Sequence, residues 1–332
     1  MRIIQFINKT GLRKVGIVEN ERINILERIE STYQLFRDVI KVDKNIQEDI
    51  HELASSRYED YSEIIEEKRI LLPLDHPDPY HLWITGTGLT HLGSAASRNE
   101  MHKKIQSTGE MDLSDSLKMF RMGVENGKMN GSVPASQPEW FYKGNGLMTV
   151  HPERELPSPS FAYDGGEEAE IVGLYIIDSK GLAKRIGFAL ANEFSDHKME
   201  SINYLYLAHS KLRACSYGPE LLLAELPRDI RGMSRILRDG KLLWEKEFLT
   251  GEDNMTHNLA NLEYHHFKYE LFQQPGDAHV HFFGASVLSY SDKVEVRDGD
   301  IFEIQSDVFG RPLRNRMSVT SNLELKTEYS PS

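Results

Sequence analysis

The sequence is poor in cysteine, in long apolar runs and in positive charge. Cys215 is the single cysteine among 332 residues. An internal disulfide is therefore impossible, which favours a reducing compartment. No stretch approaches the roughly 18–20 consecutive apolar residues that a membrane helix requires. The apolar run at residues 3–6 is too short for the core of a signal peptide. We therefore expect a cytoplasmic protein.

Acidic residues outnumber basic ones, 51 against 39, which leaves a formal net charge of −12. An acidic surface repels the phosphates of nucleic acids and of anionic membranes, so neither is an expected partner. An anionic substrate would need a bound divalent cation, or a few well-placed lysine and arginine side chains, to overcome this charge. With 39% hydrophobic and 27% charged residues, the composition is otherwise that of an ordinary globular protein.

The N-terminal part begins with two recognisable local patterns. Residues 3–6 and 15–18 alternate around a short polar turn, which predicts a β-hairpin. Ser31 and Gln34 then resemble a helix capping box, and apolar residues follow at helical spacing. Both patterns indicate a small folded unit at the start of the chain.

A boundary follows this unit. Residues 48–67 are polar and helix-prone, and three prolines at residues 73–79 break the pattern. We therefore predict a small N-terminal α+β domain at residues 1–75 and a larger catalytic domain at residues 76–332.

Short β-like runs separated by glycine and proline dominate the larger domain. They lie at residues 170–177, 186–191, 279–283 and 301–304. This pattern predicts a mixed or antiparallel sheet curled into a barrel or roll, in the α+β class. Residues 103–146, in contrast, contain four methionines and several glycines without periodicity. We interpret them as a long irregular insert, either a functional lid or a disordered loop.

Three glutamates suggest a metal site. Glu168 and Glu170 enter a predicted strand, so their side chains share one face. Two like charges on one face repel each other unless a cation lies between them. Glu193 ends the next apolar run and supplies a third carboxylate, although a charge at a helix N-terminus is the alternative reading for it. Carboxylate oxygens suit Mg²⁺ best, with Mn²⁺ or Ca²⁺ as alternatives.

The order of these motifs resembles the fumarylacetoacetate hydrolase superfamily. The matching segments, which span most of residues 80–316, are Glu168-Ala169-Glu170, Asn192-Glu193-Phe194-Ser195, Lys211, Gly218-Pro219 and the closing stretch 299–315. Two departures stand out: Glu193 replaces the usual aspartate, and the usual Gly-x-Asn-Tyr-x-x-His is replaced by residues 88–94, which end in Ser94. Both departures look like the branch that includes 2-keto-3-deoxy-arabinonate dehydratases.

The resemblance implies a mixed β-sandwich roll with peripheral helices, assembled as a homodimer or a dimer of dimers. It also implies a magnesium ion held by Glu168, Glu170 and Glu193, and a small 2-keto acid as substrate. The expected catalytic residues are Lys211, Glu100 as a general base and His102 as a proton shuttle. The expected substrate contacts are Thr90, Ser94, Arg98, Lys143, Gly284 and Ala285.

Some of these residues have simpler interpretations. Residues 97–102 could form a solvated helix face, and Lys143 could be a surface lysine. His279 and His281 would share one strand face and could bind zinc, but a carboxylate site already accounts for the chemistry.

A chelated 2-keto acid has acidic C3 protons. A base can remove one to give a metal-stabilised enolate, which expels a C4 hydroxyl as water or, with a C4 ketone, leads to C–C cleavage. Ser94 stands where a hydrolase of this superfamily has its histidine. We therefore expect a hydro-lyase that converts a 2-keto-3-deoxy pentonate, such as 2-keto-3-deoxy-arabinonate, to 2-oxoglutarate semialdehyde. The alternatives are a C–C hydrolase that releases pyruvate from a 2,4-diketo acid, and a non-catalytic sugar-acid-binding protein on the same fold.

Overall fold

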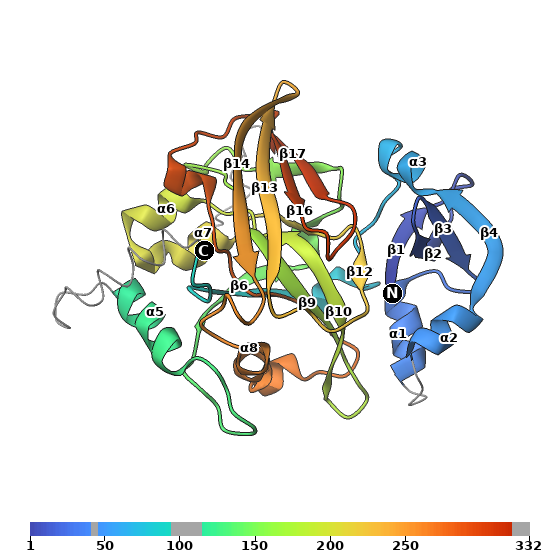
Figure 1. The fold of residues 1–332 in the computed structure, drawn as a ribbon, viewed down its shortest axis with the longest axis horizontal. Helices are drawn as coiled ribbons and strands as arrows, with labels where there is room; N and C mark the ends of the chain where they lie inside the picture. The colour runs from blue at the N-terminus through green and yellow to red at the C-terminus, as the bar shows by residue number, and fades with distance from the viewer. Residues whose placement is uncertain (41–45, 94–114, 321–332) are drawn as a thin grey trace, which may run out of the picture.

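The computed structural model describes residues 1–40, 46–93 and 115–320. Within them the strands form two sheets (Figure 1). The larger sheet contains, in spatial order, β4 (Ala54–Asp60), β3 (Arg22–Leu26), β2 (Arg13–Glu19), β1 (Arg2–Ile7), β12 (Leu221–Leu222), β10 (Ala183–Asn192), β9 (Ala169–Ile177), β15 (Ala278–Phe282), β5 (Leu82–Gly88) and β6 (Glu139–Asn145). Beside it, β11 (Cys215–Tyr217) pairs with β10, and β7 (Thr149–Val150) pairs with β11.

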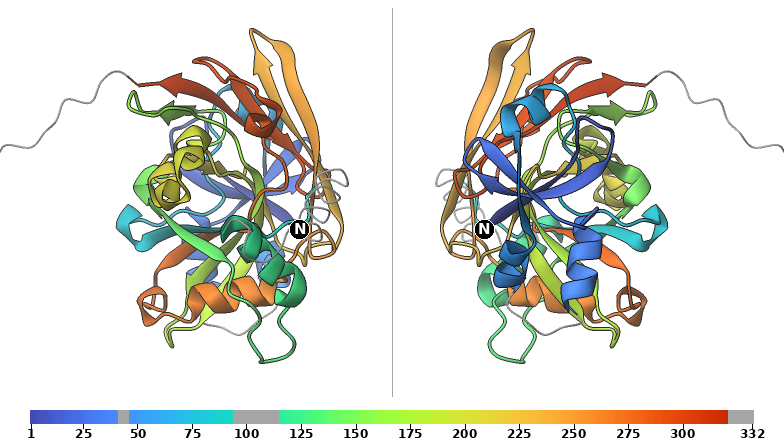
Figure 2. Two further views of the ribbon diagram at one scale, coloured as in Figure 1. Left: turned by 90° about the vertical axis from the view of Figure 1, so that its left-hand side faces the viewer. Right: turned by 90° about the vertical axis from the view of Figure 1, so that its right-hand side faces the viewer.

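The smaller sheet has the order β14 (Lys241–Thr250), β13 (Ile230–Arg238), β16 (Ile301–Gln305), β17 (Leu313–Val319) and β8 (Glu155–Ser158). Figure 2 shows its β13–β14 hairpin projecting beyond the neighbouring strands. The described helices are α1 (Thr32–Ile40), α2 (Ile46–Glu52), α3 (Tyr61–Glu66), α5 (Asp115–Asn126), α6 (His197–Ile202), α7 (Leu207–Lys211) and α8 (Leu259–Phe267). Single 3-10 turns are η1 (Pro79–His81), η3 (Gly146–Met148), η4 (Tyr204–Tyr206), η5 (Glu270–Phe272) and η6 (Ser289–Asp292).

Strand β9 lies at the centre of the fold and is buried along its whole length. Because successive side chains of a strand point to opposite faces, β9 contributes to two cores. Val172 and Leu174 pack in one apolar cluster, which extends to the N-terminal strands, and Ala169 and Ile171 pack in another. The central sheet is therefore covered on both faces, and this fixes the register of its strands.

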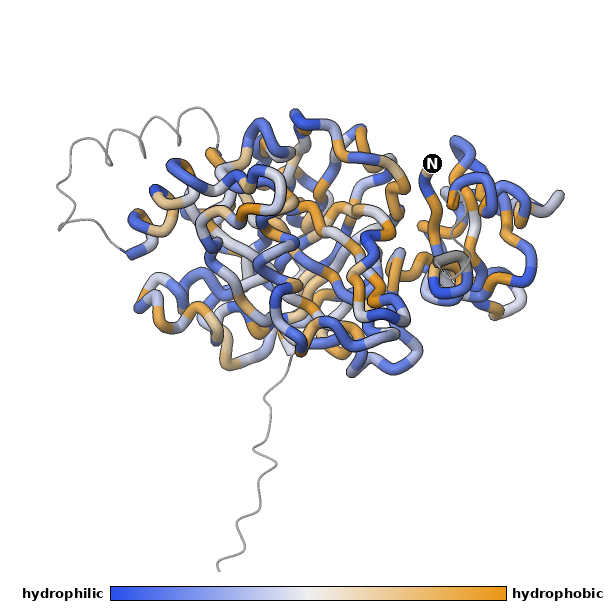
Figure 3. The backbone as a smooth tube through the Cα atoms, turned by 90° about the horizontal axis from the view of Figure 1, so that it is seen from below, coloured by the Kyte–Doolittle hydropathy of each residue, from blue (hydrophilic) through white to orange (hydrophobic). Residues whose placement is uncertain are grey.

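The N-terminal strands continue the larger sheet. Strand β1 pairs with β12, with Ile3 opposite Leu221. The salt bridge between Arg2 and the buried Glu220, 3.2 Å long, lies at the same junction. Figures 1 and 3 show this part as a lobe at one end of the molecule. The division into domains at residue 75 stays a prediction.

The strand predictions and the α+β roll are confirmed, because β9, β10 and β16 cover three of the expected runs and β15 covers all but the last residue of the run 279–283. The N-terminal hairpin is confirmed as β1 and β2. The Ser31 hydroxyl accepts a hydrogen bond from the Gln34 amide, 3.0 Å long, as a capping residue does. Along the tube in Figure 3, apolar and polar residues alternate over short distances. No described helix has the length and apolar character to span a bilayer.

Two expectations about secondary structure were wrong in part. The helix-prone residues 48–67 contribute to α2 and α3, but β4 lies between these helices and pairs with β3 at the edge of the sheet. Pairing overrode local propensity there, and an exposed edge strand lacks the apolar alternation that would have indicated it. The supposedly irregular insert contains helix α5 and strand β6, while residues 103–114 lie outside the described part.

Candidate metal centre and the cavity around it

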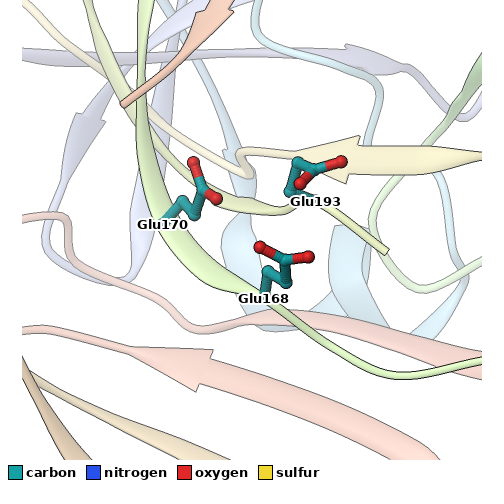
Figure 4. Close-up of side chains that lie close together, drawn as sticks. All are labelled: Glu168, Glu170 and Glu193. Carbon is teal, nitrogen blue, oxygen red and sulfur yellow. The ribbon is translucent and has the colours of Figure 1, made fainter. Parts of the chain in front are cut away.

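The antiparallel β9–β10 hairpin brings the three glutamates together. Glu170 lies in β9 and Glu168 directly precedes this strand, so the two residues are two positions apart, the spacing at which side chains of an extended chain share a face. Glu193 follows β10, and its amide donates to the Glu168 carbonyl over 3.0 Å, so the two residues stand opposite each other. All three side chains are buried, and one carboxylate oxygen from each lies within 4.8 Å of the others. Figure 4 shows the three carboxylates facing a common space.

Two buried lysines neutralise most of this negative charge. Lys143 on β6 donates to Glu193 Oε1 at 2.5 Å and to the carbonyls of Phe194 and Lys211 at 2.7 and 3.0 Å. Lys211, at the end of α7, pairs with Glu168 and, at 2.6 Å, with Glu193 Oε2. With three carboxylates and two ammonium groups, the cluster keeps an excess of negative charge.

The carboxylate least satisfied by protein partners is Glu170. Its Oε2 accepts a hydrogen bond of 2.7 Å from the Gly284 amide, but its Oε1 is buried without a partner. Burial, together with the charges of Glu193 and Glu168, raises the pKa of Glu170 well above its ordinary value. A divalent cation would remove this penalty, and three hard oxygen donors suit Mg²⁺. The residues present therefore fit the expected ion.

Glu168 is held ionised by its neighbours. Burial alone would raise its pKa, but Lys211 and His197 outweigh burial and hold the pKa well below the ordinary value. His197 is the first residue of α6, whose N-cap Asp196 accepts a hydrogen bond from the Met199 amide. The His197 Nε2 lies 3.1 Å from Glu168 Oε1. Sequence reasoning missed this histidine, because one residue behind a helix cap carries no pattern of its own.

A cavity of about 590 Å³ opens beside the triad, and Glu168, His197 and Lys211 line it. So does Glu139, the first residue of β6, which is buried and accepts a hydrogen bond from the Tyr204 phenol. Burial raises the pKa of Glu139 to about 6, although the Tyr204 hydrogen bond and the Lys211 charge oppose the rise. A carboxyl group that titrates close to neutral pH is suited to general acid–base chemistry.

Glu139 was also missed in the sequence. It shares the inward face of β6 with Phe141 and Lys143, and this alternation was the available signal. Gly88 stands opposite Glu139 in β5, and a Cβ at Gly88 would come 1.8 Å from Glu139 Oε1. The glycine therefore makes room for the carboxyl group.

The expected substrate contacts have varied positions. Ala285 lines the cavity. The Gly284 amide is used by Glu170, and all three ammonium hydrogens of Lys143 have protein acceptors. Thr90 is fully buried, and its hydroxyl donates to the Phe283 carbonyl. These geometries favour roles in holding the site together over the direct substrate contacts expected for Thr90, Lys143 and Gly284.

Four expected site residues lie outside the described residues, namely Ser94, Arg98, Glu100 and His102. Their roles stay predictions. His279 and His281 are buried on β15. Among the described residues, the cluster whose ligand atoms approach closely enough for a metal is the glutamate triad, and the alternative of a zinc site at the histidines has no such support.

No protein-family model and no curated protein matches this sequence. Solved structures do. A 2-keto-3-deoxy-D-arabinonate dehydratase in its apo form is 18% identical, with a TM-score of 0.68 over 97% of this chain and 100% of that one. A fumarylacetoacetate hydrolase from psychrophilic Exiguobacterium antarcticum is 14% identical, with a TM-score of 0.61 over 96% of this chain and 100% of that one.

The chain has the fumarylacetoacetate hydrolase fold. The same dehydratase in complex with magnesium and 2,5-dioxopentanoate has a TM-score of 0.69 at 17% identity, over 96% of this chain and 99% of that one. The resemblance inferred from motif order is thereby confirmed for the fold. At these identities the similarity establishes the fumarylacetoacetate hydrolase fold alone, and the chemistry has to be argued from the site.

Proposed function

We propose that this chain is a magnesium-dependent dehydratase of a 2-keto-3-deoxy sugar acid, with a pentonate as its substrate. The observation that carries the proposal is the buried glutamate triad, whose Glu168 lines one cavity together with Glu139 and Lys211. This arrangement combines a cation site with an acid–base group. That a similar structure is described as a complex with magnesium and 2,5-dioxopentanoate supports the choice of substrate class.

Charge also favours a 2-keto acid. The triad and its two lysines have an excess of one negative charge when all are ionised. A divalent cation reverses that excess, and the carboxylate of one keto acid then neutralises it. Bound Mg²⁺ would polarise the 2-keto group and acidify the C3 protons.

Glu139 is the group that we assign to proton transfer. In its ionised form it removes a C3 proton, and the electron pair moves to the C2 oxygen as an enolate. The C2 carbonyl then re-forms, the C3 electron pair makes a C3=C4 double bond as the C4–O bond breaks, and protonated Glu139 gives its proton to the departing hydroxyl, which leaves as water. Lys211 holds Glu168 and Glu193 in position through this cycle. The earlier assignments of Glu100 as base and His102 as shuttle remain alternatives outside the described residues.

One observation favours a second candidate, C–C hydrolysis of a 2,4-diketo acid. His197 lines the cavity and contacts Glu168, which gives a histidine–carboxylate pair that could activate water. Burial alone would lower the pKa of His197, but the hydrogen bond and charge of Glu168 raise it overall. This pair could activate water in place of the histidine that a hydrolase of the superfamily has at the position of Ser94.

Product identity separates these reactions. The protein with added Mg²⁺ is incubated with 2-keto-3-deoxy-arabinonate and, separately, with a 2,4-diketo acid, and each mixture is followed by mass spectrometry. We expect the first substrate to lose one water, and Glu139→Gln to slow this loss by about 10²- to 10⁴-fold, while Glu125→Gln on the exposed face of α5 keeps wild-type rates. Pyruvate from the second substrate alone would favour the hydrolase, and no turnover of either would favour a binding protein.

The assembly also stays a proposal. We expect a homodimer or a dimer of dimers, and light scattering on the purified chain measures which of these is present.

A further inference from the structure

A salt bridge at the cavity wall affects which chemical group the site accepts at the substrate end opposite the keto acid. Lys246 on β14 lines the same cavity as Glu168 and Lys211. Its ammonium group donates to both carboxylate oxygens of Asp292 in η6, at 3.0 and 2.9 Å. The Lys246 side chain is 32% exposed, whereas that of Glu168 is 10% exposed. Lys246 therefore lies toward the solvent side of a cavity that Glu168 of the triad also lines.

Asp292 is fixed from several directions. Its Oδ2 also accepts a hydrogen bond of 2.9 Å from the Trp244 indole. The turn that carries it begins at Ser289, whose amide and hydroxyl donate to Glu167 at 2.9 and 2.6 Å. Glu167 is buried and directly precedes Glu168 of the triad. The position of Asp292 is therefore linked to Glu168 of the triad by a short path that consists of the turn itself, the two Ser289–Glu167 hydrogen bonds and one peptide bond.

The pairing changes what Lys246 can recognise. An unpaired ammonium group at a cavity wall attracts carboxylates, but Asp292, which is not itself part of the lining, cancels most of that charge. The paired group keeps an N–H donor for a neutral acceptor. Ser286 and Ser291 line the cavity nearby and add hydroxyls that both donate and accept. Such a wall suits an alcohol and gives no advantage to a second carboxylate.

We propose that Lys246, neutralised by Asp292, makes this site select 2-keto acids whose far end carries hydroxyl groups over those that end in a carboxylate. The proposal rests on the proposed function, because it requires the keto-acid end to bind at the triad. Asp292 acts through Lys246 as a positioning residue. Its removal should therefore change selectivity for charge and leave the keto-acid end untouched.

Three six-carbon probes that differ only at C6 test this inference: 2-oxohexanoate, 6-hydroxy-2-oxohexanoate and 2-oxoadipate. Each is titrated calorimetrically into the magnesium-loaded protein. We expect the wild type to prefer the hydroxyl-ended probe. Asp292→Asn should strengthen binding of 2-oxoadipate relative to 2-oxohexanoate by up to about fivefold, the upper end of the range for a partly exposed ion pair. Asp307→Asn, which changes an exposed aspartate, is the matched control.

A second variant separates charge from folding defects. Lys246→Met should abolish the preference for the hydroxyl-ended probe, and in the Asp292→Asn background it should remove the gain for 2-oxoadipate. Equal shifts of all three probes, or no shift in Asp292→Asn, would overturn the inference and leave the dehydratase proposal standing. Failure of every probe to bind the wild type would overturn the proposed function, and the inference with it.

Discussion

Two buried clusters of titratable side chains lie on opposite faces of the same sheet. In the glutamate triad, Glu170 lies on one face of β9, Glu168 directly precedes β9 and Glu193 directly follows β10. On the other face, His279 and His281 of β15 stand opposite Tyr175 and Gly173 of β9, and His266 of α8 packs against them. Both clusters are almost inaccessible to solvent, yet they differ in how the cost of burying a charge is met.

Lysines compensate charge in the triad, where the pKa of Glu168 is lowered, whereas the histidines stay neutral. Lys143 and Lys211 compensate the carboxylates. The imidazoles instead stack on rings, with His266 and His281 parallel at 4.5 Å, and burial lowers the pKa of both His279 and His281 to about 3. Burial therefore does not decide the charge of a group by itself. The charge of a buried group depends on the partners that the fold places beside it. These partners distinguish the triad, which could hold a cation, from the histidine cluster, which stays neutral.

The largest expected effect comes from breaking the charge compensation. Lys143→Met removes one donor from Glu193 and one from each of two carbonyls, and removing one partner of a buried pair costs about 3–5 kcal/mol of unfolding free energy. Urea unfolding of the metal-free protein measures it. Lys184→Met, at an exposed lysine of β10, should change stability by less than about 0.5 kcal/mol. Equal costs for the two variants would mean that the triad needs no internal cation.

A second change removes the carboxylate that lacks a partner. Loss of residues that only orient metal ligands costs roughly 10- to 100-fold in metal affinity or activity. Because Glu170 is itself a proposed ligand, Glu170→Gln should lower both the Mg²⁺ affinity and the activity by more than this. The neutral amide also relieves repulsion by Glu168 and Glu193, so the metal-free variant should melt at a higher temperature than the wild type. Calorimetric Mg²⁺ titration and thermal melts measure the two effects. Full activity of Glu170→Gln with a chelator present would rule out the metal centre.

The histidine cluster should respond to acid. Because the folded-state pKa of His279 is about 3 and the unfolded value is about 6.5, the unfolded chain binds the proton first as pH falls. The contribution of His279 to the free energy of unfolding is therefore complete above pH 6.5. It declines toward pH 3 by up to about 1.4 kcal/mol per pH unit. His279→Phe should flatten the pH dependence of urea unfolding between pH 7 and 5 by this amount. His209→Phe, at an exposed histidine, should leave the slope unchanged, and equal slopes for all three proteins would contradict the argument.

The smallest effect concerns the acid–base group. Tyr204→Phe deletes the hydrogen bond that lowers the pKa of Glu139, so that pKa should rise further above about 6. The acid limb of the kcat/KM profile should move to higher pH by less than about one unit, since a single neutral hydrogen bond is worth about 1 kcal/mol. Tyr206→Phe, in the same 3-10 turn but exposed, is the control. A shift of the kcat/KM profile in both variants, or in neither, would mean that Glu139 is not the group that titrates in the acid limb.

Much of the metal centre could be predicted from sequence, and less of its surroundings. Glu168 and Glu170 alternate in a strand, and the next apolar run ends at Glu193, so strand geometry already brought them together. Glu139 was missed, because two of the three inward residues of β6, Glu139 and Lys143, are charged, so this face does not have the apolar pattern of an ordinary buried strand face. The role of Lys143 depended on two backbone carbonyls that only the folded chain places beside it.

The pairing of β1 with β12 has a consequence for engineering the chain. Cutting at residue 75 would appear to remove a self-contained module, but β12 would then present unpaired backbone groups along an open edge. The same cut would uncover the apolar cluster in which Ile3 and Val15 pack with Leu174 and Val280. We expect such a truncated protein to aggregate on expression. Exchange of the N-terminal lobe for that of another protein would therefore require redesign of the β1–β12 pairing and of the apolar cluster.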